Sequence, residues 1–200
     1  MEKEIFTQKK LTVLANDAYF NAQRHGFYPD NTDITTALML IITEMSEAVQ
    51  ADRHNRHGSI EDYESEIQMG RDIPTAYKNT LEGTVESEFA DVGIRILSLL
   101  GGMDIKRPTK FQSDSYLKEE YEIAKIKYKC GIARDFYRII CVLCTQIGNN
   151  SQYWYISKII QQTLMQVFAL AQNNNIDLME HIKLKMKYNE SRPYLHGCKY

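Results

Sequence analysis

The sequence has little of what marks secreted scaffolds, turn-rich folds and nucleic-acid-binding proteins. Four cysteines in 200 residues are too few for a disulfide-stabilised scaffold of this size. Only four prolines and ten glycines argue against a fold with many tight turns. The 24 lysines and arginines are balanced by 26 aspartates and glutamates, so the net charge is −2. Because the basic excess of a nucleic-acid-binding domain is missing, we expect no nucleic-acid partner.

An apolar segment suited to a membrane is also lacking. The chain starts Met1-Glu-Lys-Glu-Ile5, which is too charged for a secretory signal. The longest stretch without a charge, residues 139–157, contains several amide and hydroxyl side chains that would be costly in lipid. Apolar residues make up 44% of the chain and charged residues 25%, which is typical of a globular protein. We therefore expect one cytoplasmic domain over residues 1–200, without membrane contact.

The cysteines do not predict a metal site. Cys141 and Cys144 form a C-x-x-C pair on an apolar helical stretch. A zinc site needs further ligands, and the remaining cysteines, Cys130 and Cys198, each stand alone. We predict that Cys141 and Cys144 are core thiols.

Helical periodicity dominates the sequence, and the alternation typical of strands is hard to find. The predicted fold class is all-α, a helical bundle. The segment 58–83 holds Gly70 and Pro74, so we expect mainly loop there, with a short helix over 60–69. We expect the third long helix to end at Gly101-Gly102, because glycine commonly follows a helix. The other expected helices span residues 6–24, 33–53, 84–100, 116–129, 132–147, 153–172 and 176–189.

Charge is distributed unevenly along the chain. Residues 44–91 contain twelve acidic and four basic side chains, whereas residues 183–200 contain five basic and one acidic. Two solvated faces would explain this pattern. A site that uses both signs of charge would explain it equally well.

Two pairs of acidic residues, each spaced three apart, lie on otherwise apolar predicted helices. Glu44 and Glu47 follow a stretch, 34–43, that has no charge at all. Glu88 and Asp91 form part of one narrow polar seam on a helix that is apolar nearly all round. Residues three apart share a helical face, so each pair points in one direction. A buried carboxylate without a partner costs several kcal/mol, so these groups need compensation.

A hard divalent cation would supply that compensation. All-oxygen ligation suits Mg²⁺, with Mn²⁺ as the second option. The alternative is a set of ordinary salt bridges with Arg95, Arg53 and lysines. Other chemistries lack their motifs: the chain has no Glu-x-x-His, no His-Asp dipeptide, no Walker A loop and no G-x-S-x-G.

Three motifs in order resemble those of the MazG-like all-α nucleoside triphosphate pyrophosphohydrolases, whose pattern is E-E-x-x-E, then E-x-x-D, then K-x-x-x-N-x-x-R. The motifs read Ile42-Thr-Glu44-Met-Ser-Glu47-Ala, Glu88-Phe-Ala-Asp91-Val-Gly-Ile-Arg95 and Lys185-Met-Lys-Tyr-Asn189-Glu-Ser-Arg192. The resemblance covers about residues 25–103 and 164–197. Two departures stand out: Thr43 replaces the first glutamate of the E-E pair, and residues 103–155 look like a helical insertion.

The resemblance implies a function and a set of residues. It implies that Glu44, Glu47, Glu88 and Asp91 hold Mg²⁺, and that a (deoxy)nucleoside triphosphate is hydrolysed to the monophosphate and pyrophosphate. By the same analogy the protein forms a homodimer or a higher homo-oligomer.

We expect a metal-activated water to attack in line, with one of Glu44 and Glu47 as ligand and the other as its orienting or basic group. The sequence does not say which is which. A non-catalytic helical oligomer or binding protein, with the acids kept as salt bridges, is the alternative function.

Candidate substrate-binding residues lie at the two ends of the chain. Lys185, Asn189 and Arg192 are spaced to share one helical face, although Arg192 precedes Pro193 and can lie beyond the helix end. Lys185 and Arg192 would bind phosphate. Analogy with the family places the nucleobase near the loop after the first helix, with His25, Phe27 and Tyr28 as candidates. A solvated basic tail and a hydrophobic anchor for the loop are the alternative explanations.

Overall fold

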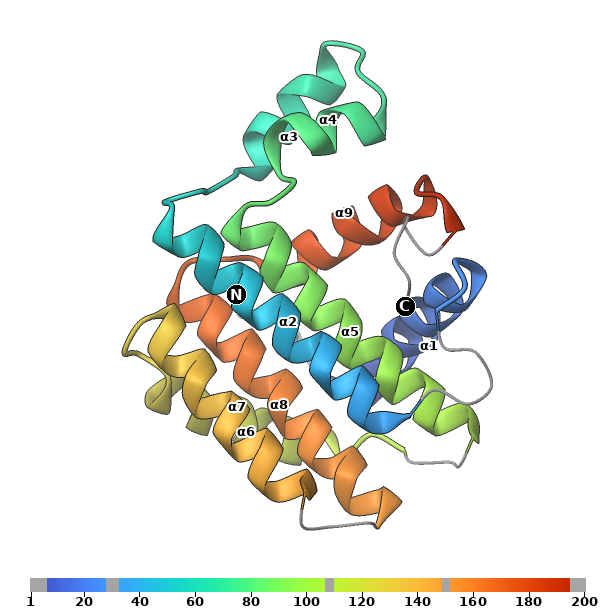
Figure 1. The fold of residues 1–200 in the computed structure, drawn as a ribbon, viewed down its shortest axis with the longest axis vertical. Helices are drawn as coiled ribbons and strands as arrows, with labels where there is room; N and C mark the ends of the chain where they lie inside the picture. The colour runs from blue at the N-terminus through green and yellow to red at the C-terminus, as the bar shows by residue number, and fades with distance from the viewer. Residues whose placement is uncertain (1–6, 28–32, 107–109, 149–151, 195–200) are drawn as a thin grey trace.

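The computed structural model describes residues 7–27, 33–106, 110–148 and 152–194, and every regular element in these ranges is a helix (Figure 1). The all-α prediction is therefore confirmed. None of the described helices is both long enough and apolar enough to cross a bilayer. The helices are α1 (Gln8–Arg24), α2 (Ile34–Arg53), α3 (Ile60–Gln68), α4 (Ile73–Thr80), α5 (Val85–Lys106), α6 (Asp114–Lys127), α7 (Ile132–Gly148), α8 (Tyr153–Asn173) and α9 (Leu178–Glu190).

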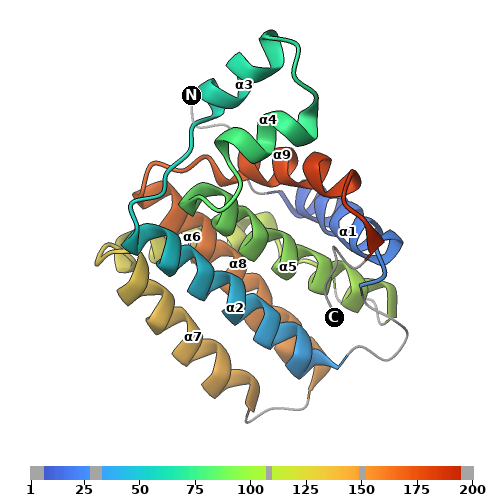
Figure 2. The same cartoon turned by 45° about the horizontal axis from the view of Figure 1, so that its top comes forward.

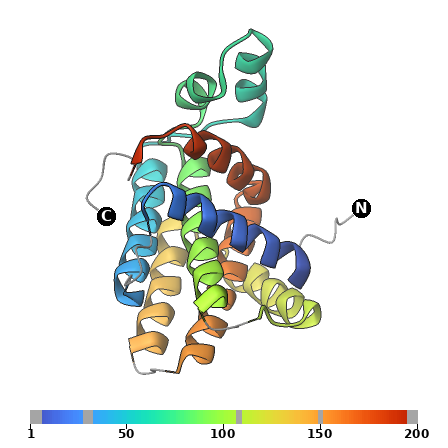
Figure 3. The ribbon, with the colours of Figure 1, turned by 90° about the vertical axis from the view of Figure 1, so that its right-hand side faces the viewer.

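Helix α5 is the centre of the bundle, and it packs against α1, α2, α8 and α9 (Figures 1 and 3). Its apolar side chains are buried nearly all round the helix, among them Phe89, Val92 and Ile96. They belong to one large hydrophobic core to which α1, α2 and α6 to α9 also contribute. A helix that is apolar on all sides is stable only when it is surrounded in this way.

Helix α5 does not end at Gly101-Gly102, as the sequence suggested, but continues to Lys106. The two glycines allow α1 to approach closely. A Cβ atom on Gly101 would lie 2.3 Å from the backbone oxygen of Ala15, and one on Gly102 would lie 2.8 Å from the ring of Tyr19. A glycine inside a helix costs about 0.5–1 kcal/mol relative to alanine. Here the close packing of α1 on α5 offsets that cost.

The segment 58–83 is more helical than expected, because α4 follows α3 within it. Asp72 caps α4: its carboxylate accepts a hydrogen bond from the backbone N–H of Thr75 at 2.8 Å. Pro74 lies in the first turn, where a missing N–H costs nothing. The sequence-based expectation of a loop overlooked this start signal. Helices α3 and α4, residues 60–80, form an arm that projects from the bundle (Figures 1 and 2).

Helices α6 and α7, which lie within the predicted insertion, belong to the same core as the rest of the bundle. Both pack against α8, and the ring of Phe136 on α7 lies 4.9 Å from that of Phe89 on α5. The expectation that Cys141 and Cys144 are core thiols is wrong, because both are exposed. The buried stripe of α7 runs instead through Phe136, Ile139, Leu143 and Ile147, and it turns the cysteines toward solvent.

Candidate functional site

A pocket of about 380 Å³ lies where α1, α2, α5 and α9 meet. Each of the nine site residues predicted from the sequence lines this pocket; Tyr28, a further base-stacking candidate, falls outside the described residues. The helices bring together side chains that are more than 160 positions apart in the sequence. The nine residues are His25, Phe27, Glu44, Glu47, Glu88, Asp91, Lys185, Asn189 and Arg192.

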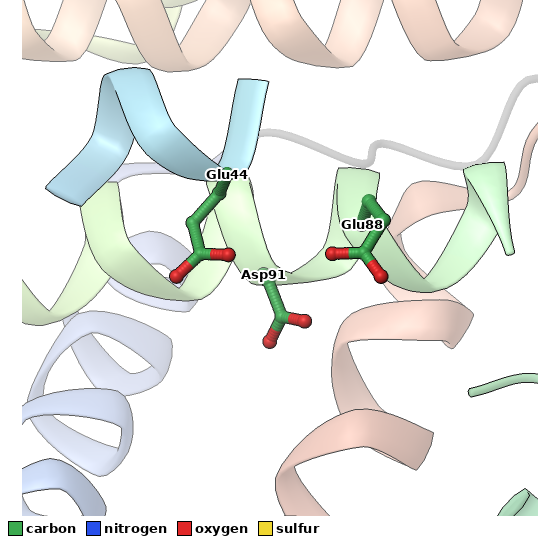
Figure 4. A group of neighbouring side chains, drawn as sticks. All are labelled: Glu44, Glu88 and Asp91. Carbon is green, nitrogen blue, oxygen red and sulfur yellow. The ribbon is translucent and has the colours of Figure 1, made fainter. Parts of the chain in front are cut away.

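Three of the four predicted metal-binding acids form a tight cluster. Each of Glu44, Glu88 and Asp91 offers a carboxylate oxygen, and these oxygens all lie within 4.8 Å of one another (Figure 4). We call these three residues the carboxylate triad. Glu47 is not part of it: its side chain lies one turn further along α2, is exposed, and lines the same pocket.

The triad forms because two amphipathic patterns meet. Ile41, Met45 and Ala48 fix the buried face of α2, which places Glu44 at the boundary with α5. Glu88 and Asp91 lie on the polar seam of α5, one turn apart. Glu44 and Glu88 are each only 9% exposed, so water solvates neither carboxylate well.

Burial and mutual repulsion raise the proton affinity of two members of the triad. The pKa of Glu44 is raised to about 7, by burial first and by the Asp91 carboxylate second, while Arg95 opposes the shift. The pKa of Glu88 is likewise raised to about 7, by burial first and by Asp91 second, with Lys185 opposing the shift. The site holds more carboxylates than basic partners, so an added cation would reduce the repulsion between them.

Arg95 compensates the triad on one flank. Its Nε donates to Glu44 Oε1 at 2.9 Å, and its guanidinium lies 5.2 Å from the centre of the Phe27 ring. The alternative prediction, in which the acids form ordinary salt bridges, named Arg95 as a partner. It also named Arg53, which is exposed and donates to the side-chain oxygen of Gln50.

Lys185 compensates the triad on the other flank, from α9. Its Nζ lies 2.6 Å from Asp91 Oδ2 and donates to Ser87 Oγ at 3.0 Å. The same atom lies 5.5 Å from the centre of the Tyr77 ring and 5.8 Å from that of Tyr188. Lys185 is therefore buried beneath two aromatic rings and reaches the carboxylates from within the protein.

The other predicted residues line the rest of the pocket. His25 Nδ1 hydrogen-bonds to the backbone oxygen of Asn21 at 2.8 Å, in the turn after α1. Asn189 is buried, and its Oδ1 accepts no hydrogen bond within the described part of the chain. Arg192 lies just beyond the end of α9, as the following proline suggested, and its guanidinium is 5.8 Å from the Tyr188 ring. Thr43, at the position of the absent glutamate, lines the pocket and donates its hydroxyl to Met39 O.

Two residues that touch the site escaped sequence reasoning. Ser87 directly precedes Glu88, and its small side chain gives no pattern of its own. Tyr77 lies in the segment that was expected to be loop, yet its hydroxyl donates to Ser87 Oγ at 3.1 Å. Recognition of the Asp72 cap and Pro74 would have placed Tyr77 on a helix, but not against α5.

Comparisons with protein-family models, with curated proteins and with solved structures found no match to this chain. A functional conclusion therefore rests on the geometry and charge of the pocket and on the three sequence motifs.

Proposed function

We propose that this protein is a Mg²⁺-dependent hydrolase that converts a (deoxy)nucleoside triphosphate to its monophosphate and pyrophosphate. The observation that carries the proposal is the convergence of Glu44, Glu88 and Asp91 in one pocket. The pocket also holds basic groups for phosphate and, near Phe27, an aromatic surface for a base.

The donor set fits Mg²⁺ or Mn²⁺. The three clustered groups are all carboxylates, which are the ligands that these hard cations prefer. Burial first, and the Asp91 carboxylate second, raise the pKa values of Glu44 and Glu88, so a cation would offset both the lost hydration and the repulsion. Bound there, the ion would offset the charge of the triphosphate and make a water molecule more acidic.

Glu47 is suited to handle the attacking water. It lines the pocket beside the triad, but it is exposed and forms no ion pair among the described residues. In the reaction the water oxygen bonds to the α-phosphorus, and the bond to the bridging oxygen breaks. Pyrophosphate leaves with that electron pair, and the carboxylate of Glu47 takes the proton of the water. Of Glu44 and Glu47, Glu44 is then the metal ligand, because it is held within the triad.

The remaining pocket residues suit the rest of a nucleotide. Arg192, half-buried at the pocket edge, would bind phosphate oxygens. The Oδ1 atom of Asn189 is buried without a hydrogen bond among the described residues, and a base or sugar donor would satisfy it. Phe27 and His25 offer flat rings on the α1 side of the pocket.

A non-catalytic binding protein is the second candidate, because two ion pairs, Arg95–Glu44 and Lys185–Asp91, compensate part of the triad. Those pairs do not account for Glu88, which forms no ion pair with any described residue although it is buried. A buried carboxylate without an ion-pair partner favours a cation site over a purely structural network. Assembly into a homo-oligomer stays a prediction, which light scattering would test.

A panel of nucleoside triphosphates with Mg²⁺, assayed for pyrophosphate and orthophosphate separately, tests the proposal. We expect pyrophosphate release that falls by about 100-fold or more in Glu47→Gln and Asp91→Asn. Glu64→Gln, on the exposed face of the arm, is the matched control and should be fully active. Absence of release with every nucleotide would favour the binding protein, whereas equal turnover in all variants would overturn the roles given to Glu47 and Asp91.

A further inference from the structure

The arm formed by α3 and α4 touches the rest of the protein through a small hydrophobic cluster of its own. The cluster joins Tyr63, Ala76 and Tyr77 of the arm to Leu184 and Tyr188 of α9. It is separate from the main core. At its centre the rings of Tyr77 and Tyr188 stack face to face, with 4.5 Å between centroids and 9° between planes.

This cluster continues directly into the carboxylate triad. The Tyr77 hydroxyl donates to Ser87 Oγ at 3.1 Å, and Lys185 Nζ donates to the same oxygen at 3.0 Å. Lys185 Nζ also lies 2.6 Å from Asp91 Oδ2. Tyr77, Ser87 and Lys185 are all buried, so the contacts form an enclosed path from the arm to the triad.

Burial of a lysine ammonium group is costly unless every donor is satisfied. Here an oxygen of Ser87, a carboxylate of Asp91 and two aromatic faces surround it. The lysine side chain has four rotatable bonds, so packing has to restrict it to one position. The Tyr77 ring lies against this ammonium group, and the Tyr77 hydroxyl donates to the same serine oxygen to which Lys185 donates.

We propose that Tyr77 is a positioning residue for the metal site: from the arm it holds the Lys185 ammonium group against Asp91 and so fixes the orientation of that carboxylate. In this arrangement Lys185 is a permanent part of the carboxylate site rather than a ligand of the substrate phosphates. The consequence for metal binding rests on the proposed function, whereas the placement of Lys185 does not.

The experiment compares Tyr77→Phe with Tyr63→Phe in the full chain. Tyr63 belongs to the same cluster, with its ring 6.4 Å from that of Tyr77, and among the described residues no hydrogen bond or cation–ring contact joins it to Ser87 or Lys185. Mn²⁺ affinity is measured from the electron paramagnetic resonance signal of the free ion. Loss of one hydrogen bond in the path should weaken Mn²⁺ binding by about 3-fold to 10-fold in Tyr77→Phe. Tyr63→Phe should bind Mn²⁺ like the wild type. This should hold even if Tyr63→Phe and Tyr77→Phe both lower the melting temperature by the same amount, so a general loss of stability would not explain the difference in Mn²⁺ affinity.

A second measurement needs no metal. Amine labelling followed by mass spectrometry reports how well Lys185 is protected, and we expect protection in the wild type and in Tyr63→Phe but faster labelling in Tyr77→Phe. Failure of the wild type to bind Mn²⁺ would overturn the proposed function, and the labelling result would then decide the placement of Lys185 alone. Unchanged Lys185 labelling in Tyr77→Phe would overturn the positioning role. If the wild type binds Mn²⁺, an equal Mn²⁺ affinity of Tyr77→Phe would overturn it as well.

Discussion

The carboxylate triad has two flanks that are built alike but differ in exposure. On each flank a basic side chain pairs with one carboxylate and lies over an aromatic ring. Arg95 pairs with Glu44 beside Phe27, and its side chain is 23% exposed. Lys185 pairs with Asp91 beneath Tyr77, and its side chain is 5% exposed.

This difference in exposure separates two roles. A buried cation cannot exchange partners without a large desolvation penalty, so Lys185 serves the architecture of the site. A partly exposed guanidinium can exchange a carboxylate for a phosphate at a lower cost, because it is less desolvated than a fully buried cation. The Arg95 flank is therefore the side on which a ligand would act, and the Lys185 flank is the side that the protein holds fixed.

The largest expected effect comes from Glu88, the member of the triad that pairs with neither cation. Glu88→Gln should reduce pyrophosphate release by about 100-fold or more, because one metal ligand is lost while both ion pairs remain. Without metal, the Glu88→Gln variant should melt at a higher temperature than the metal-free wild type at pH 8, because the variant lacks a carboxylate that its neighbours repel. A lower melting temperature at unchanged turnover would show that Glu88 serves the fold and not a cation.

The second prediction compares the two flanks directly. Lys185→Met should lower the free energy of unfolding by about 3 kcal/mol, because it leaves the Asp91 carboxylate without its buried partner. Arg95→Met should lower it by about 1 kcal/mol, in keeping with a partly hydrated pair. Urea unfolding of the metal-free variants measures both values. Equal losses would abolish the distinction between a fixed flank and an exchangeable one.

The third prediction concerns pH. The pKa values of Glu44 and Glu88 are raised to about 7 in the folded protein, from 4.5 for a free glutamate. The folded state therefore holds protons that the unfolded state has already released, and it loses this advantage as pH rises through 7. Metal-free stability should fall by about 2 kcal/mol for each of the two glutamates between pH 5 and pH 8. Mg²⁺ should restore it at pH 8.

The control for this pH effect is Glu88→Gln, whose stability should depend less on pH over the same range. Burial lowers the pKa of His181. This shift has the opposite effect on the pH dependence, because a protein with a buried neutral histidine loses stability as pH falls. The difference between wild type and Glu88→Gln cancels that contribution. A difference that does not change with pH would contradict the raised pKa of Glu88.

The sequence was sufficient for the long helices and for the shared face of each acidic pair, because both depend on local spacing. Glu88 and Asp91 share a face by virtue of their separation alone, and the apolar residues around them predicted burial. What local spacing does not predict is which distant element packs on that face. Gly101 allows α1 to approach where a helix end was expected, and Tyr77 on α4 reaches Ser87 on α5 across the short non-helical segment 81–84. The prediction that Cys141 is a core thiol failed for a related reason. An apolar helix buries only one stripe of side chains, and the sequence did not identify which stripe of α7 is buried.

The smallest effect should come from Phe27, on the open flank. Phe27→Leu keeps most of the apolar volume but removes the ring beneath the Arg95 guanidinium, an interaction of about 0.5–1 kcal/mol. We expect the KM for the nucleotide to rise by about 2-fold to 5-fold, with Mn²⁺ affinity unchanged. Tyr77→Phe should give the opposite pattern, with weaker Mn²⁺ binding as its main effect. If Phe27→Leu instead weakened Mn²⁺ binding as much as Tyr77→Phe does, both aromatic residues would be supports of the triad. Arg95 would then belong to the fixed part of the site, and Arg192 alone would bind the phosphates.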